Sequence, residues 1–163
     1  MLRKLYLLRH AQAVTGSLSI PDEQRALTPD GEAVSKHVGE FLKQKNSNIN
    51  LILSSPALRT KQTSLLIAKQ LTPEPEIQFE RSIYNGDVPA LLKLLTRLPD
   101  TITEAMLTGH YPAVVDLHNY LASNNRIRAM NTGELIALRF DTTWQQLSAG
   151  TATFEYAFHP HEP

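Results

Sequence analysis

The sequence predicts one α/β domain with a doubly wound, largely parallel sheet and helices on both faces. Short apolar runs alternate along the chain with longer amphipathic stretches, a pattern typical of strands separated by helices. A length of 163 residues suits a single domain with one substantial core. Hydrophobic residues make up 42% of the chain and charged residues 20%, which indicates a globular protein rather than a disordered one.

The expected strands are short, and those at residues 5–8, 51–53 and 105–107 are expected to be buried. Apolar runs predict them at residues 5–8, 51–53, 77–79, 105–107 and 133–140. Near the C-terminus, Phe154, Tyr156 and Phe158 alternate with other residues, which predicts a half-buried edge strand that is a candidate for antiparallel pairing. We place the domain at residues 1–158 and expect residues 159–163 to form a flexible tail.

Two of the expected helices begin with capping signals. Thr28 is a predicted N-cap and Pro29 the first residue of a helix that runs to about residue 45. Ser55 and Pro56 repeat this pattern at the start of a second helix, and further helices are expected at 88–98 and 111–121. Three residues in or near these helices are expected only to pack or to lie on the surface: His37, His118 and Trp144.

The overall charge and the absence of cysteine exclude several classes of function. Lys plus Arg number 16, as do Asp plus Glu, so no polyanion-binding surface is expected, and nucleic acid and membrane are not expected partners. Without cysteine there is no disulfide, thiol catalysis or thiolate metal site. The N-terminal apolar run is too short for a secretory signal or a membrane span, so we expect a cytoplasmic protein.

Three separate segments of the chain deliver basic residues to one rim of the predicted sheet. Arg9 and His10 follow the first strand, Arg59 lies in the first turn of the helix after the second, and His110 follows the strand at 105–107. In open α/β sheets, ligands bind beyond the carboxyl ends of the strands. Two arginines and two histidines at such a place indicate phosphate chemistry, because a guanidinium donates paired hydrogen bonds and neutral histidine is a nucleophile near pH 7.

Four motifs in order along residues 1–140 resemble those of the histidine phosphatase superfamily, the phosphoglycerate-mutase-like proteins. In chain order they are Arg9-His10-Ala11, Asp22-x-x-Arg25-x-Leu27-Thr28-x-x-Gly31, the segment 54–63 with Arg59, and Thr108-Gly109-His110-Tyr111-Pro112. The second of these, at 22–31, is similar to a stretch of the short SixA-type phosphohistidine phosphatases. The resemblance implies the doubly wound α/β fold and a phosphatase that needs no cofactor or metal.

The resemblance also implies a role for each matching residue. His10 would be the nucleophile, and Arg9, Arg59 and His110 would bind the phosphoryl oxygens and stabilise the transition state. Arg25 either forms a structural pair with Asp22, the interpretation we favour, or contacts the substrate. Tyr111 stands where most relatives have Asn.

A general acid is not evident in the sequence. Many relatives place a carboxylic acid after the third strand, where this chain has Glu80 and Asp87 outside any clear motif. An alkoxide leaving group needs a proton donor, whereas the imidazole of phosphohistidine can be protonated on its own ring before it leaves. This difference favours a phosphoramidate substrate over a phosphate ester.

We therefore predict a metal-independent phosphatase that acts through phosphohistidine at His10. The expected substrate is phosphohistidine on a protein, such as a phosphotransfer domain of a signalling or sugar-uptake relay, because the short chain has little length for a cap over a small molecule. Two alternatives are a small-molecule phosphomonoesterase and a module that binds a phosphorylated partner without turnover.

Overall fold

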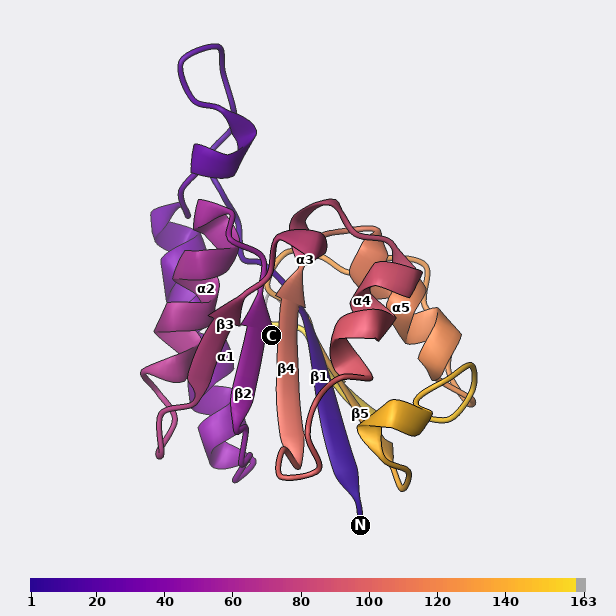
Figure 1. The fold of residues 1–163 in the computed structure, drawn as a ribbon. Helices are drawn as coiled ribbons and strands as arrows, with labels where there is room; N and C mark the ends of the chain where they lie inside the picture. The colour runs from indigo at the N-terminus through magenta and orange to yellow at the C-terminus, as the bar shows by residue number, and fades with distance from the viewer. Residues whose placement is uncertain (161–163) are drawn as a thin grey trace.

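The computed structural model describes residues 1–160, which form a six-stranded sheet with helices on both faces (Figure 1). The strand order is β3-β2-β4-β1-β5-β6. The strands are β1 (Arg3–Arg9), β2 (Leu51–Ser54), β3 (Glu76–Phe79), β4 (Glu104–Gly109), β5 (Leu135–Phe140) and β6 (Thr153–Phe158). Strands β3, β2, β4 and β1 are parallel, whereas β5 and β6 are antiparallel to their neighbours. The predicted α/β class, including an antiparallel edge strand, is confirmed.

Strand β5 runs against β1 because of the route the chain takes to reach it. The segment before β5 ends beside the carboxyl end of β1, so that Leu135 pairs with Leu8 and Phe140 with Arg3. Gly133 makes this approach with a left-handed backbone, φ 81°, a conformation that glycine adopts without steric cost. Its N–H bonds to the carbonyls of Arg9 and His10, each at 3.0 Å.

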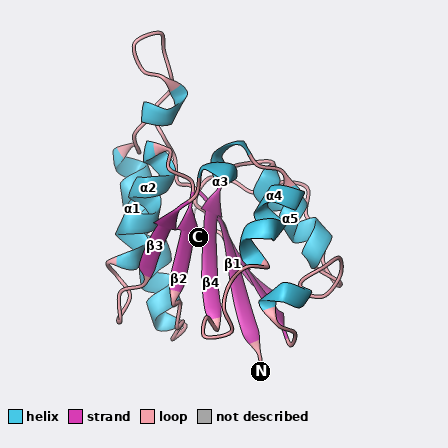
Figure 2. Ribbon diagram, viewed as in Figure 1, coloured by secondary structure: helices cyan, strands magenta, loops and turns pink. Residues whose placement is uncertain are grey.

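The helices form two layers that Figure 2 shows on opposite sides of the sheet. Helices α1 (Pro29–Gln44) and α2 (Leu58–Ala68) cover one face, and α4 (Val88–Leu95) and α5 (Ala113–Leu121) cover the other. Each face has its own apolar core: Val38, Leu42 and Ile67 pack in one, and residues such as Leu91 and Val114 pack in the other. Shorter elements complete the chain: η1 (Asp22–Gln24), α3 (Arg81–Asn85) and η2 (Trp144–Gln146).

One of the two predicted helix starts is confirmed and the other is wrong by two residues. The Thr28 hydroxyl caps α1 by accepting a hydrogen bond from Gly31 N at 3.0 Å. Helix α2 begins at Leu58, with Ala57 as its N-cap, instead of at Pro56. The reason is that Ser55 still extends the strand ladder, since its N–H bonds to the Thr108 carbonyl at 3.2 Å.

Other helix ends also differ from the prediction by a few residues. Helix α4 ends at Leu95 instead of residue 98, and α5 begins at Ala113 instead of residue 111. Residues 96–98 continue as a turn, and residues 110–112 form the loop that leaves β4. Within the described part of the chain, no helix is long and apolar enough to span a membrane.

The residues expected to pack or to lie on the surface do so. Trp144 is fully buried and its indole N–H donates to the Ile102 carbonyl at 2.7 Å. His118 is buried against Asn125, and His37 is exposed beside Phe158. Of the expected tail, His159 lies 3.0 Å from the Glu134 carboxylate, while residues 161–163, including His161, lie outside the described residues.

Candidate active site

A pocket of about 510 Å³ lies at the carboxyl ends of β1 and β4. All four residues that the sequence predicts for phosphate chemistry line it, although they come from three separate segments: Arg9, His10, Arg59 and His110. We call these four residues the floor of the pocket. A second set, which we call the rim, also lines it and comes from the η1 region and α3: Asp22, Arg25 and Tyr84.

His10 is held in one orientation by the backbone that follows it. Its Nδ1 lies 2.7 Å from the Ala11 carbonyl oxygen, and because that oxygen can only accept, Nδ1 carries the hydrogen. The lone pair is therefore on Nε2, which is the nitrogen that can attack phosphorus. Burial, with smaller contributions from His110, Arg59 and Arg9, lowers the pKa of His10 to about 3, so the ring is neutral near pH 7.

The two arginines of the floor are anchored by carbonyl groups. Arg9 donates from Nη1 to the Met130 carbonyl at 2.7 Å, and its guanidinium lies 5.3 Å from the centre of the Tyr111 ring. Arg59 is 6% exposed and donates from Nη1 to the Asp22 carbonyl at 2.8 Å. In both guanidinium groups, Nε is buried and has no hydrogen-bond partner among the described residues. Both side chains line the pocket, where a guanidinium can donate to an anion.

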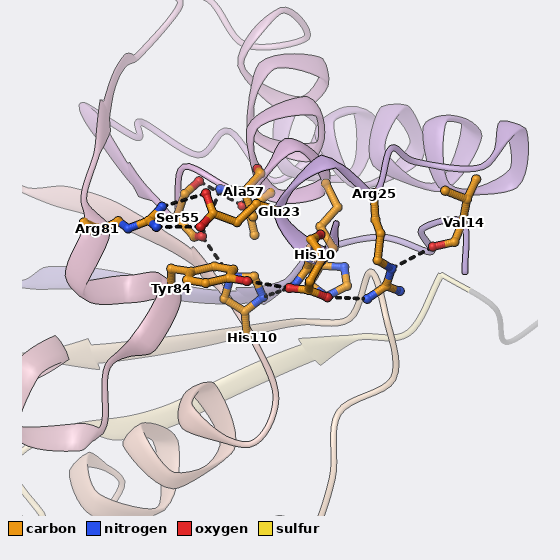
Figure 3. Close-up of polar contacts among 12 residues, drawn as sticks. His10, Val14, Glu23, Arg25, Ser55, Ala57, Arg81, Tyr84 and His110 are labelled. Carbon is orange, nitrogen blue, oxygen red and sulfur yellow. Dashed lines mark hydrogen bonds and ion pairs between the residues drawn. The ribbon is translucent and has the colours of Figure 1, made fainter. Parts of the chain in front are cut away.

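His110 completes the floor opposite His10. The two rings lie 5.4 Å apart, and His110 Nε2 is 2.8 Å from the Ser55 hydroxyl (Figure 3). Burial and then Arg59 lower the pKa of His110 to about 4, so it is neutral before an anion binds. A bound phosphoryl group would favour the charged imidazolium, because an opposite charge raises the pKa of histidine.

The rim is a network of side-chain pairs around one carboxylate. Asp22 accepts from the Tyr84 hydroxyl at 2.6 Å, from Arg25 Nη1 at 3.0 Å and from Arg59 Nη2 at 3.1 Å. Beside it, Glu23 forms a two-bond ion pair with Arg81 (Figure 3). These pairs fasten η1, in the segment that stands out from the body in Figure 1, across to α2 and α3.

Of the other candidate residues, Arg25 lies at the pocket, whereas Glu80 and Asp87 do not. Arg25 pairs with Asp22, the geometry of the interpretation we favoured, and it also lines the pocket. Glu80 and Asp87 do not line the pocket, and Asp87 instead caps α4 by accepting from Ala90 N at 3.2 Å. Sequence reasoning did not single out Tyr84, because nothing in the local sequence of α3 marks it.

Comparisons with known proteins agree with the sequence motifs. The model of the histidine phosphatase superfamily (branch 1) matches residues 5–83. An uncharacterized chloroplastic protein of Arabidopsis thaliana is 36% identical over 157 residues, which covers 90% of this chain and 71% of that protein. The chain belongs to the histidine phosphatase superfamily. The matched residues 5–83 include Arg9, His10 and Arg59, and the fold adds His110 to them.

Solved structures share the same architecture. SixA from Nakamurella multipartitia aligns with a TM-score of 0.88 at 22% identity, covering 99% of this chain and 98% of that one. The protein histidine phosphatase SixA complexed with tungstate aligns with a TM-score of 0.84 at 23% identity, covering 96% and 97%. At these identities the likeness is one of fold. Family and fold together identify the chain as a histidine-type phosphatase.

Proposed function

We propose that this histidine phosphatase hydrolyses phosphohistidine on a protein and that His10 carries the phosphoryl group as an intermediate. One observation carries the proposal: a neutral His10, with its lone pair on Nε2, shares a pocket with Arg9, Arg59 and His110. Nε2 attacks phosphorus, the P–N bond of the substrate breaks, and its electron pair goes to the substrate nitrogen. Water then attacks the phosphorus, the bond to Nε2 breaks, and inorganic phosphate leaves.

The floor supplies the charge that both transfers need. Arg9 and Arg59 are placed to bind non-bridging oxygens, and His110 joins them as its pKa rises next to the anion. Because protein cations do this work, we infer that no metal is required. The fold relative solved in complex with tungstate supports a site for a tetrahedral oxyanion, since tungstate has the shape of phosphate.

The lining of the pocket favours a phosphoramidate over an ester. Neither Glu80 nor Asp87 lines it, so neither is placed to protonate an alkoxide. A phosphohistidine brings its own ring proton to the leaving group. The mouth carries exposed residues, such as Tyr111 at 47% exposure, which suits a protein surface as the bearer of the phosphoryl group. A phosphotransfer domain in a signalling relay fits this chemistry, and the cytoplasmic location stays a prediction.

The test is phosphate release from a histidine-phosphorylated phosphotransfer domain and from p-nitrophenyl phosphate, in the presence of a chelator, for the wild type and His10→Ala. We expect rapid release from the phosphoprotein that His10→Ala abolishes. Release from the ester alone would make the chain a small-molecule phosphomonoesterase. Release that survives His10→Ala would refute the nucleophile, and binding of the phosphoprotein without release would favour a non-catalytic module. Activity lost with chelator and restored by a metal would contradict metal independence.

A further inference from the structure

Asp22 is an anion in a pocket that is otherwise built to bind anions. Among the described residues that line the pocket, it is the only carboxylate, and three arginines line the same space: Arg9, Arg25 and Arg59. Its side chain is 51% exposed, so it faces the space that a substrate enters. A carboxylate here repels a phosphoryl group, and its presence therefore needs a reason other than phosphate binding.

The groups around Asp22 keep it ionised. The Tyr84 hydrogen bond makes the largest contribution that lowers the pKa of Asp22, and the hydrogen bonds of Arg25 and Arg59 and the charge of Arg59 add to it. Together they hold this pKa well below its usual range, although burial opposes them with the second largest effect. Glu23 and His110 are the other titratable groups close to it. Asp22 is therefore a poor proton donor near neutral pH, and it can act in phosphoryl transfer only as a hydrogen-bond acceptor or as a counter-charge.

The carboxylate still has capacity for one more donor. Oδ2 accepts from both Tyr84 and Arg59, whereas Oδ1 accepts from Arg25 alone. A carboxylate oxygen has two lone pairs, so Oδ1 can take a second hydrogen bond. With three guanidinium groups and Asp22 in its lining, the pocket is close to neutral once a phosphoryl group of about −1.5 to −2 has entered it.

We propose that Asp22 accepts a hydrogen bond from the ring N–H of the phosphohistidine substrate and thereby selects this leaving group over esters. This inference rests on the proposed function and names the residue that determines its specificity. The ring nitrogen remote from phosphorus carries the proton that Asp22 holds. As His10 Nε2 bonds to phosphorus, the P–N bond breaks, its electron pair stays on the ring nitrogen, and the imidazole leaves as a neutral molecule.

The experiment compares wild type with Asp22→Asn, which keeps the shape of the side chain and can still accept from Arg59 and Tyr84. The substrates are a histidine-phosphorylated phosphotransfer domain and p-nitrophenyl phosphate, whose leaving group departs as a stable anion. We expect the ratio of kcat/KM on the phosphoprotein to kcat/KM on the ester to fall about 10- to 100-fold, the range for a lost hydrogen bond to a charged group. The alkaline limb of the phosphoprotein pH profile should also move to lower pH, because the imidazolium loses its counter-charge.

Glu23→Gln is the matched control. Glu23 is the neighbour of Asp22 in η1 and pairs with Arg81, but it does not line the pocket. This variant loosens the same segment, and the ratio of the two activities should stay at the wild-type value. Inhibition by tungstate, measured for all three proteins, reports whether the floor is intact.

Three outcomes would overturn the inference. If Asp22→Asn lowers both activities equally, Asp22 only positions Arg59. If it raises both activities and strengthens tungstate inhibition, the carboxylate competes with phosphate for the floor. If Glu23→Gln changes the ratio as much as Asp22→Asn does, the effect belongs to the segment. A wild type that hydrolyses the ester but not the phosphoprotein would instead refute the proposed function, and the inference with it.

Discussion

Backbone carbonyls hold three of the four floor residues, Arg9, His10 and Arg59, whereas side-chain pairs hold most of the rim. His10 and Arg9 bond to the carbonyls of Ala11 and Met130, and both belong to the carboxyl end of β1. Asp22, Arg25 and Tyr84 instead bond mainly to one another, on segments outside the sheet. The floor is thus fixed with the core, while the rim can change without unfolding the protein. We infer that chemistry belongs to the floor and choice of substrate to the rim.

Arg59 belongs to both regions, so its removal should have the largest effect. Arg59→Ala takes a donor from the phosphoryl group and an anchor from Asp22. We expect kcat/KM to fall about 10²- to 10³-fold on phosphohistidine and ester substrates alike, as when an oxyanion-hole donor is lost. Arg59→Lys, which keeps the charge without the planar fork, should recover only part of this loss. Steady-state phosphate release that stays within tenfold of wild type for Arg59→Ala would contradict its place in the floor.

Gly31 tests how rigidly the segment after His10 is held. A Cβ at this buried position would overlap the backbone carbonyl of Gln12, which also accepts from the Thr28 N–H at 3.0 Å. Because a backbone cannot move aside as a side chain can, Gly31→Ala should lower the free energy of unfolding by about 1–3 kcal/mol in urea titrations. Gly39→Ala in the same helix meets the Gln70 side chain and should cost less. If Gly31→Ala lowers the free energy of unfolding no more than Gly39→Ala does, the backbone around Gln12 can shift to make room for the added Cβ.

The same contrast between the regions explains what the sequence could predict. The floor follows from topology: once parallel strands are recognised, their carboxyl ends must meet, and Arg9, His10, Arg59 and His110 come together there. The rim depends on pairs such as Glu23 with Arg81, 58 residues apart, and on Tyr84 in a five-residue helix that no pattern predicted. Such pairs form only after the fold has brought two surfaces together.

The sequence also did not predict that β5 would run antiparallel to β1. The apolar run at 133–140 predicts a strand, but its direction depends on where the connection from α5 ends. The N–H of Gly133 donates to the carbonyls of Arg9 and His10, and these two hydrogen bonds fix the end of the connection beside the carboxyl end of β1. Alternation at Phe154, Tyr156 and Phe158 did predict the edge strand, although the three side chains do not share one face. Tyr156 and Phe158 pack against Phe41 of α1, whereas an irregularity in the pairing with β5 leaves Phe154 on the other face, beside His118 of α5.

The neutral histidines of the floor should make stability depend on pH. Unfolded His10 titrates near its ordinary pKa of about 6.5, whereas in the folded chain burial lowers its pKa to about 3. Between these values only the unfolded chain binds the proton. The free energy of unfolding therefore falls as pH drops below about 6.5, by at most about 1.4 kcal/mol per pH unit for this group.

His10→Asn should remove this contribution, so that its stability declines less than that of wild type between pH 7 and pH 5 in urea titrations. His110, with a pKa of about 4, contributes with the same sign and keeps part of the decline in the variant. His37→Asn, at an exposed position, is the control and should follow wild type. Parallel curves for wild type and His10→Asn would contradict a buried neutral His10.

Tyr84→Phe should give the smallest effect, and it tests whether the rim is a network. The variant loses the 2.6 Å hydrogen bond to Asp22 but keeps the ring that meets His110 edge-on at 5.6 Å. Arg25 and Arg59 still hold the carboxylate, so we expect kcat/KM on phosphohistidine to fall only about threefold, as for one partly exposed hydrogen bond. The urea midpoint should not move, and Tyr120→Phe, on the exposed side of α5, should leave both readouts unchanged. A loss as large as that of Asp22→Asn would mean that Tyr84 alone positions the carboxylate, and that the rim is a single contact rather than a shared set of pairs.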